Sequence, residues 1–569
     1  MGTKDLWRIV LMVLTIGNAV FAVANSSESA IIGKKFIAFG WEFGGASVSN
    51  LLAVADELDA TALDGVGINL NFRRNDGRWV NFSESFMHEP ALQWDEISPL
   101  VQTFGKLVSH RSMKESFILM FCSPTNRLDW ADDDAWKRLS INLRMVARLA
   151  KRSSLRGICL DDEDYRRQGQ FVRKAGDLPI RPLTALVRRR AREVFSPVFE
   201  EYPDMAMFLF RFFTAGKAYP GSGDPLATSV TRGDLWPWFL NGILDVLPPM
   251  AKLIDGYEDS YEFDALREDY LKGYVVSRFR LANMADGAEN RRKYRMQVSS
   301  SMAIFLDMYG RKEGSSYYSP PYNGTRFGHL AANLSQLSFA ADEYVWFWGE
   351  SRTWVDWRAY GRNFVSKGLW QEAYGGIVEM IEALKDPNGY ALRKLKSLKR
   401  AGAFRPANPN SCCEMPAGGM PDVLTAPYSS WAEKKNGRKN RFYFDTTTGE
   451  GDRSSICAED VQGCVMLNAS GLHAGEIYLV GFSVKGAPAC GTLYWKRREK
   501  WDFLTLPGVA ISVSEADENG WCHAVTTVAV PVGADGFGLQ LVPMQAKGEK
   551  SWFDNVFYHK AAGTPSVSR

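Results

Sequence analysis

Apolar runs alternate with amphipathic segments between residues 30 and 403. Eight of these runs are apolar almost throughout, as is typical of parallel strands that are buried on both faces. The predicted strands are Phe36–Trp41, Leu63–Phe72, Ser116–Cys122, Gly157–Asp162, Met205–Phe212, Lys252–Tyr257, Ser300–Met308 and Tyr344–Trp348. Between them apolar residues recur every three or four positions, for example over Asp134–Lys151, Leu183–Phe199 and Leu330–Ala341, which predicts amphipathic helices.

Eight strand–helix repeats in this order predict an α/β fold, a (β/α)8 TIM barrel with extended loops. An open, doubly wound sheet is the alternative, and it usually carries a G-x-G-x-x-G turn after its first strand. The turn after the first predicted strand, residues 40–45 (GWEFGG), contains glycines without that spacing. The pattern therefore favours a closed barrel over residues 30–403.

The pattern changes after a basic helical segment, Tyr390–Arg400. Residues 404–420 are rich in proline, glycine and asparagine, which predicts a linker, and residues 563–569 are expected to be a frayed tail. From 421 to 562 the apolar runs are short and separated by glycine and proline turns, which predicts an all-β sandwich. Its predicted strands are Gly475–Lys485, Gly491–Lys496, Cys522–Pro531, Gly536–Pro543 and Ser551–Tyr558.

The N-terminal residues predict a secretory signal peptide over residues 1–24. Lys4 and Arg8 precede an apolar run, Ile9–Phe21, and residues 22–24 (AVA) follow it as an A-x-A cleavage pattern. The alternative is an uncleaved membrane anchor, but the apolar run is short for a bilayer span. We therefore expect cleavage after Ala24 and a secreted or periplasmic protein without membrane insertion.

Charge and composition narrow the classes of function. The formal net charge of +3 predicts no general attraction to nucleic acid or to anionic membranes. With six histidines and no CxxC pair, the sequence predicts neither a catalytic metal nor a cofactor required for catalysis. Cys122 and Cys159 lie in predicted strands and are expected to be buried thiols. Six further cysteines are able to form disulfides whose pairing the spacing does not determine: Cys412, Cys413, Cys457, Cys464, Cys490 and Cys522.

Acidic residues follow two of the predicted strands. The fourth strand ends in residues 161–165 (DDEDY) and the sixth in residues 255–261 (DGYEDSY). Active sites of (β/α)8 barrels lie at the carboxyl ends of the strands, and glycoside hydrolysis needs two carboxyl groups there. We expect Glu163, which lies beyond the apolar part of its strand, to act as general acid/base and Glu258 as nucleophile or base. The alternative for both segments is a solvated acidic loop with helix caps.

Other polar and aromatic residues at strand ends are expected to bind the substrate. The flat face of an aromatic ring can stack on the apolar face of a pyranose, and the tryptophan-rich end of the eighth strand is typical of a sugar subsite. The alternative is that these tryptophans only pack the barrel against its last helix. The candidate substrate-binding residues are Trp41, Glu42, Asn69, Asn71, Asp161, Arg211, Tyr257, Tyr309, Trp348 and Glu350.

Two parts of the chain resemble known families. Residues 136–165 resemble the region from the third helix to the fourth strand of bacterial TIM-barrel glycoside hydrolases. Residues 475–478 (GEIY), the pair Trp495 and Trp501, and residues 552–556 (WFDNV) resemble jelly-roll carbohydrate-binding modules. The second resemblance implies a structural calcium ion near one edge of the sandwich.

The acids also depart from one pattern of these families. The largest clan of retaining barrel glycosidases places its two acids after strands four and seven, with an Asn-Glu pair at strand four. Here the acids follow predicted strands four and six, and strand four carries Asp162 before Glu163. Retaining and inverting outcomes therefore both stay open, because the outcome depends on the separation of the two carboxyl groups.

The sequence thus predicts an exported glycoside hydrolase that cleaves a poly- or oligosaccharide with two carboxyl groups. Two alternatives stay open: a non-catalytic glycan-binding protein on a barrel scaffold, and a metal-dependent barrel hydrolase that uses Asp161–Asp164. An open mouth with two facing carboxyl groups would favour hydrolysis, and a plugged mouth would favour binding alone. Three or more acids within reach of one ion would favour the metal enzyme.

Overall fold

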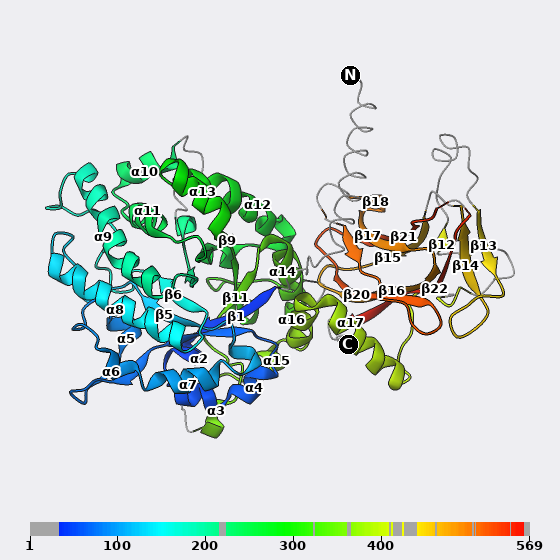
Figure 1. The fold of residues 1–569 in the computed structure, drawn as a ribbon, viewed down its shortest axis with the longest axis horizontal. Coiled ribbons are helices and arrows are strands. Elements are labelled where there is room, and N and C mark those ends of the chain that lie inside the picture. Colours follow the sequence, from blue (N-terminus) through cyan, green and yellow to red (C-terminus); the bar gives the residue numbers. More distant parts are fainter. Residues whose placement is uncertain are drawn as a thin grey trace, which may run out of the picture.

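A computed structural model describes residues 34–215, 224–322, 325–360, 366–408, 411–413, 424–425, 441–460, 464–502, 506, 508–546 and 548–562. The predicted signal peptide and C-terminal tail lie outside these residues, as does part of the predicted linker. Within the described residues, a barrel of parallel strands and helices is followed by two antiparallel sheets (Figure 1). The predicted fold class is therefore confirmed.

The barrel sheet has the order β10-β11-β1-β2-β5-β6-β7-β8-β9, and all its pairs are parallel. Its strands are β1 (Lys35–Gly40), β2 (Gly65–Asn69), β5 (Phe117–Phe121), β6 (Gly157–Asp161), β7 (Ala206–Leu209), β8 (Lys252–Asp255), β9 (Val298–Ser300), β10 (Met302–Phe305) and β11 (Tyr344–Gly349). Only Ser301 separates β9 from β10, and its amide donates to the carbonyl of Asp255 (2.8 Å). These two segments are therefore one interrupted seventh strand, which closes the barrel.

Alternating side chains fill the barrel interior. On β1, Ile37 and Phe39 belong to the inner cluster, and the aromatic rings of Phe210 and Trp346 stack there with centroids 4.6 Å apart. Trp348, the next residue of β11 on the same face, is only partly buried and lines a cavity. The lower barrel is therefore a packed core, and open space begins at the carboxyl ends of the strands.

Helices connect the strands and cover the outside of the sheet. In α8 the Asp132 side chain accepts a hydrogen bond from the Ala135 amide (2.9 Å), and acids in the first turn and bases in the last turn complement the helix dipole. The longer helices are α7 (Leu100–Leu107), α8 (Asp133–Arg152), α9 (Ile180–Glu201), α10 (Pro225–Arg232), α11 (Trp236–Val246), α13 (Gly287–Gln297), α14 (Arg326–Ala340), α16 (Ile377–Lys385) and α17 (Pro387–Arg400). The shorter helices are α2 (Trp41–Gly44), α3 (Val48–Ala53), α4 (Ala55–Asp59), α5 (Phe82–Ser85), α6 (Trp94–Ile97), α12 (Asp269–Val275) and α15 (Trp370–Ala373).

The C-terminal region is a sandwich of two antiparallel sheets. One contains β12 (Leu424–Thr425), β15 (Val465–Ser470), β21 (Gly536–Pro543), β17 (Ala489–Arg497), β18 (Lys500–Trp501) and β19 (Val509–Ile511). The other contains β13 (Arg441–Asp445), β14 (Ser455–Glu459), β22 (Lys550–Ala562), β16 (Ile477–Gly486) and β20 (Trp521–Ala529). Trp495 and Trp521 are buried, and Trp495 belongs to the sandwich core, so neither ring forms an exposed platform.

The sandwich packs against helices on one side of the barrel (Figure 1). Leu479 and Val525 form a small apolar cluster with Ala391 of α17. The hydroxyl of Ser335 in α14 donates to the carbonyl of Val530 (3.3 Å). The two domains therefore share an apolar and hydrogen-bonded interface.

The described cysteines are all free thiols, so no disulfide joins any of them. Cys122 and Cys159 are buried in the barrel, as predicted. In the described part of the chain, no helix combines the length and apolarity needed to cross a bilayer.

Candidate active site

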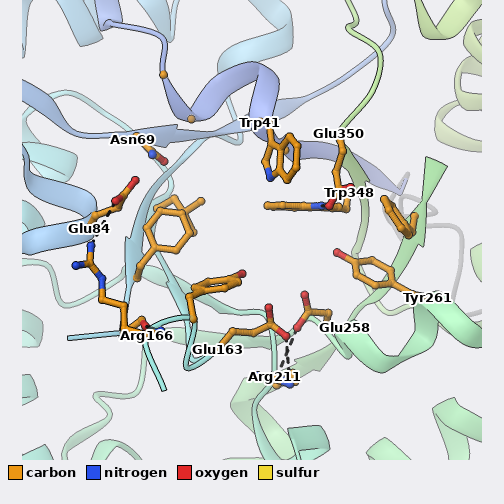
Figure 2. Close-up of a pocket in the computed structure, with 18 of the residues that line it drawn as sticks. Trp41, Asn69, Glu84, Glu163, Arg166, Arg211, Glu258, Tyr261, Trp348 and Glu350 are labelled. Carbon is orange, nitrogen blue, oxygen red and sulfur yellow. Dashed lines mark hydrogen bonds and ion pairs between the residues drawn. The ribbon is translucent and has the colours of Figure 1, made fainter. Parts of the chain in front are cut away.

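A cavity of about 750 Å³ opens at the carboxyl ends of the barrel strands (Figure 2). Segments that follow all eight barrel strands contribute to its wall, so it is assembled from distant parts of the chain. Both predicted catalytic residues, Glu163 and Glu258, line it. Of the predicted substrate-binding residues, Trp41, Asn69, Arg211, Trp348 and Glu350 line it as well.

Arg211, which follows β7, joins the two predicted catalytic carboxyl groups. Its guanidinium lies 3.7 Å from Glu163 Oε1 and 3.6 Å from Glu258 Oε2, and its Nε donates to Asp162 Oδ1 (3.2 Å). Figure 2 shows Glu163 and Glu258 side by side above this guanidinium. The closed barrel thus brings together two carboxyl groups that lie almost one hundred positions apart in the sequence.

The turn after β6 is built around Asp161, which is fully buried. Its carboxylate accepts hydrogen bonds from the Glu163 amide (2.9 Å) and the Tyr165 hydroxyl (2.8 Å). Burial raises the pKa of Asp161 to about 7. Asp161 therefore shapes the turn that presents Glu163, and it does not line the cavity.

The segment after β8 presents Glu258 at the start of η3 (Glu258–Glu262), a short 3-10 helix. Tyr257 adopts a left-handed backbone conformation (φ 46°), and the buried Asp255 accepts hydrogen bonds from the Phe212 amide (3.1 Å) and the Thr214 hydroxyl (2.5 Å). Burial, together with the negative charges of Asp161 and Glu163, raises the pKa of Glu258 to about 9. Glu258 is therefore protonated near neutral pH.

The opposite wall combines tryptophan rings and a carboxylate. The indole of Trp348 donates to Glu350 (3.2 Å), whose own amide donates to the buried Asp307 (2.8 Å). Trp41 is 58% exposed and follows Gly40, where an added Cβ would lie 2.1 Å from the Gly349 carbonyl oxygen. Close approach of β1 and β11 therefore places two indole rings at the cavity, where they can stack on a sugar.

Four buried polar atoms on this cavity have no hydrogen-bond partner among the residues that the structure describes. They are Asn69 Oδ1, Asn81 Oδ1, Glu258 Oε2 and the Tyr261 hydroxyl. Buried polar groups are normally paired, since an unpaired one costs about 1–3 kcal/mol. Their presence around one cavity indicates a site arranged to accept hydrogen bonds from a ligand and to donate to it.

Four predicted substrate-binding residues besides Asp161 do not line this cavity. Glu42 is buried, and its carboxylate accepts hydrogen bonds from the Trp354 amide (2.8 Å) and the Trp357 indole (2.8 Å). Tyr309 is buried and accepts a hydrogen bond from Asn333 (2.6 Å). Their neighbours in the folded chain, which local sequence does not reveal, satisfy these polar groups.

Asn71 and Tyr257 also lie away from this cavity. Asn71 is in the hairpin of β3 (Asn71–Arg73) and β4 (Trp79–Asn81), opposite Asn81, and it is Asn81 that lines the cavity. The Tyr257 ring packs against Phe263 (5.2 Å between centroids) and lines a neighbouring cavity of about 440 Å³. For both residues the predicted strand end does contribute to the cavity, but a different side chain lines it.

Sequence reasoning missed several cavity residues because they follow the strand ends at greater distance. Glu84 of α5 accepts a hydrogen bond from Asn81 (2.8 Å) and lies 3.6 Å from Arg166. Tyr165 and Arg166 directly follow the acidic run, which was a usable signal. For Glu84 the only signal was the long polar insertion after the second strand.

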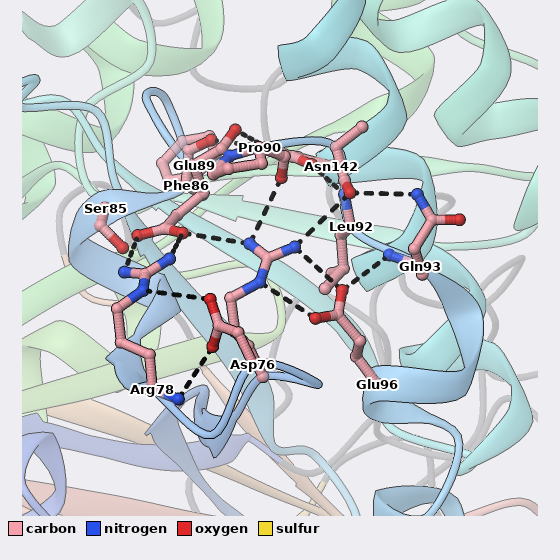
Figure 3. A network of polar contacts seen from close by, with 12 residues as sticks. Asp76, Arg78, Ser85, Phe86, Glu89, Pro90, Leu92, Gln93, Glu96 and Asn142 are labelled. Carbon is pink, nitrogen blue, oxygen red and sulfur yellow. Dashed lines mark hydrogen bonds and ion pairs between the residues drawn. The ribbon is translucent and has the colours of Figure 1, made fainter.

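A network of buried ion pairs holds that insertion in place (Figure 3). Arg74 donates to both oxygens of Glu96 (3.0 and 2.9 Å) and to Glu89 (3.0 Å). Asn142 of α8 donates to the Glu89 carbonyl (3.1 Å) and accepts from the Leu92 amide (2.8 Å). The network therefore ties the loop that carries Asn81 and Glu84 to the barrel.

The acids at the mouth do not form a metal site in the described part of the chain. There, one set of three candidate ligands has its ligand atoms within 4.8 Å of one another: Asp56, Asp59 and His110, on α4 and just after α7. The acids of residues 161–164 do not belong to it. This geometry disfavours the metal-dependent hydrolase.

The calcium ion implied by the module resemblance would need oxygen ligands at the sandwich edge. Asp554 of β22 is buried and accepts hydrogen bonds from the amides of Glu450 (2.7 Å) and Asn555 (2.6 Å). Burial, and then the charges of Asp452 and Glu450, raise the pKa of Asp554 to about 7. Carboxylate oxygens are ligands that calcium prefers, but these three carboxylates are not gathered within 4.8 Å of one another. Holding calcium would require Glu450 or Asp452 to move closer.

Comparisons with known proteins give weak likenesses. No family model and no curated protein matches the chain. The alpha-amylase from Geobacillus thermoleovorans is similar over 90% of this chain and 99% of its own, with 9% identity and a TM-score of 0.31. The CBM22-2 xylan-binding domain of Paenibacillus barcinonensis Xyn10C is similar over 25% of this chain and 94% of its own, with 11% identity and a TM-score of 0.20. At such scores the description of the fold rests on strand order and register alone.

Proposed function

We propose that this chain is a glycoside hydrolase that cleaves a poly- or oligosaccharide with Glu163 and Glu258. The observation that carries the proposal is the pairing of these two carboxyl groups across Arg211 at the floor of an open cavity. Glycoside hydrolysis needs one carboxyl group that is protonated and a second that is ionised. Tryptophan rings on the wall opposite this pair supply the stacking surfaces that a sugar needs.

The proton belongs on Glu258 in this proposal. Its pKa of about 9 keeps it protonated near pH 7, so it can protonate the glycosidic oxygen as that oxygen leaves. Glu163, which is more exposed, then acts as the nucleophile or as the base that activates water. The sequence alone suggested the opposite assignment, because it does not show how deeply each residue is buried.

The open cavity favours hydrolysis over the non-catalytic alternative. A barrel kept only as a scaffold has no need for two carboxyl groups beside a single guanidinium, nor for several unpaired polar atoms around the same cavity. Export also stays a proposal, which rests on the N-terminal pattern of residues 1–24.

The test of this function is a screen of the mature protein against plant, algal and host glycans, with reducing ends and product sizes as readouts. The wild type should release sugars from at least one glycan, and the double variant Glu163→Gln/Glu258→Gln should release none. Equal release by both proteins would overturn the assignment of the site.

The pH dependence of kcat/KM should reflect the ionisation of Glu258. Because the acid acts in its protonated form, kcat/KM should fall as pH rises through about 9, where Glu258 loses its proton. Initial rates between pH 5 and 10 on the glycan found in the screen measure this limb. An alkaline limb near pH 7 would show that another group carries the proton.

We further propose that calcium stabilises the sandwich through Asp554. Free calcium at one hundred times its Kd should add about 2.7 kcal/mol to the free energy of unfolding of that domain. Calorimetry in calcium and in chelator measures the shift in Tm, which Asp554→Asn should abolish. A Tm in wild type that is the same in both buffers would contradict the proposal.

A further inference from the structure

Carboxyl groups outnumber guanidinium groups among the described residues that line the cavity. The acids compared are Glu84, Glu163, Glu258 and Glu350, and the bases are Arg166 and Arg211. Glu258, with a pKa of about 9, is uncharged near neutral pH. Asp162 and Glu163 still share the single guanidinium of Arg211, so the described part of the cavity floor favours cations and neutral groups over anions.

Each described guanidinium at this cavity already has a carboxylate partner. Arg166 lies 3.6 Å from Glu84, and Arg211 is shared among the acids on the floor. Arg311, behind the rim, stacks over Phe305 and lies 3.7 Å from Glu350. An anionic substituent would have to displace one of these carboxylates before it could pair with a cation.

Two polar side chains at the cavity are instead suited to neutral hydroxyl groups. Asn69 is 3% exposed and lines the cavity (Figure 2), and its Oδ1 accepts no hydrogen bond from any described residue. The hydroxyl of Tyr261 is likewise buried without a partner. An amide oxygen can accept a hydrogen bond from a sugar hydroxyl, and a phenol can donate to one or accept from one.

We infer that the cavity takes a neutral glycan and discriminates against chains that carry carboxylate or sulfate groups. The inference rests on the proposed hydrolase function and goes beyond it by naming the class of substrate. Paired arginines, excess carboxylates and unpaired amide and phenol groups all favour an uncharged, hydroxyl-rich ligand.

Two derivatives of the same glycan test whether the substrate is of the neutral class. The glycan that wild type cleaves is prepared in hydroxyethyl and carboxymethyl forms at equal substitution, so that bulk is matched and charge differs. At low ionic strength kcat/KM should be at least about tenfold higher for the hydroxyethyl form. In about 1 M NaCl the gap should narrow, because the Debye length falls to about 3 Å.

A charge variant sharpens the test. Glu84→Gln removes the carboxylate partner of Arg166. The ratio of kcat/KM for the hydroxyethyl form to kcat/KM for the carboxymethyl form should therefore fall about threefold. Glu200→Gln, an exposed acid on the outer helix α9, should leave the ratio unchanged.

The outcomes separate the inference from the proposed function. Equal rates on both derivatives, or cleavage of naturally anionic glycans alone, would overturn the neutral class and leave the hydrolase standing. Absence of cleavage on every neutral and anionic glycan would overturn the hydrolase, and the inference with it.

Discussion

Glu258→Gln should lower kcat on the natural glycan by about 10²–10⁴-fold, because it removes the proton donor to a poor leaving group. On a dinitrophenyl glycoside of the same sugar the loss in kcat/KM should stay below about tenfold, since kcat/KM reports the first bond cleavage and a phenolate leaves without protonation. Glu163→Gln should lose activity on both substrates, because attack at the anomeric carbon is needed in either case. Steady-state kinetics of the two variants on the two substrates make the comparison.

The matched control for this experiment is Glu200→Gln, which makes the same change from carboxylate to amide at an exposed position of α9, far from the barrel mouth. Its rates should equal those of wild type. If Glu163→Gln spared the dinitrophenyl substrate and Glu258→Gln did not, the two roles would be reversed, as the sequence alone suggested.

Arg74→Met should destabilise the barrel by about 3–5 kcal/mol, because it leaves buried carboxylates without their cation. The Arg74 side chain is 7% exposed, and its partners Glu89 and Glu96 are 8% and 4% exposed. Chemical denaturation followed by tryptophan fluorescence measures the change in the free energy of unfolding. Activity per folded molecule should fall as well, since the network anchors the loop that carries Glu84.

Two further variants separate burial from charge. Arg78→Met removes a half-exposed partner of the same Glu89 and should cost less than Arg74→Met. Arg74→Met combined with Glu96→Leu should recover part of the loss, because a buried ion pair replaced by apolar groups is often tolerated. A single Arg74→Met variant as stable as wild type would show that the network contributes nothing measurable.

The fold was largely predictable because its signals are local. Strands buried on both faces are apolar in an unbroken run, and eight such runs appear in the sequence. The seventh strand was predicted to start at Ser300, whereas β9 already starts at Val298, because the serines at residues 299–301 interrupt the apolar pattern there. In the sandwich, six strands of two to six residues were not predicted, since short strands are easily missed: β12, β13, β14, β15, β18 and β19.

The candidate site was predictable only in part. Glu163 and Glu258 stood out as acids beyond apolar strands, and both line the cavity. Glu42 and Tyr309 also lie at or beyond the ends of predicted strands, yet neither lines the cavity. The Glu42 carboxylate accepts a hydrogen bond from the Trp354 amide, and the buried Tyr309 hydroxyl accepts one from Asn333. Which polar residue faces the cavity depends on partners that are distant in the sequence.

The sequence by itself determined that strands and helices alternate eight times and that a β-rich domain follows. It also determined that acidic residues follow the fourth and sixth strands. These features are visible because hydrophobic periodicity and strand ends are properties of local sequence. Only the tertiary structure decided that Arg211 joins Glu163 to Glu258 and that Glu258 holds the proton. Closing the barrel sets those distances and that burial, and a pKa responds to both.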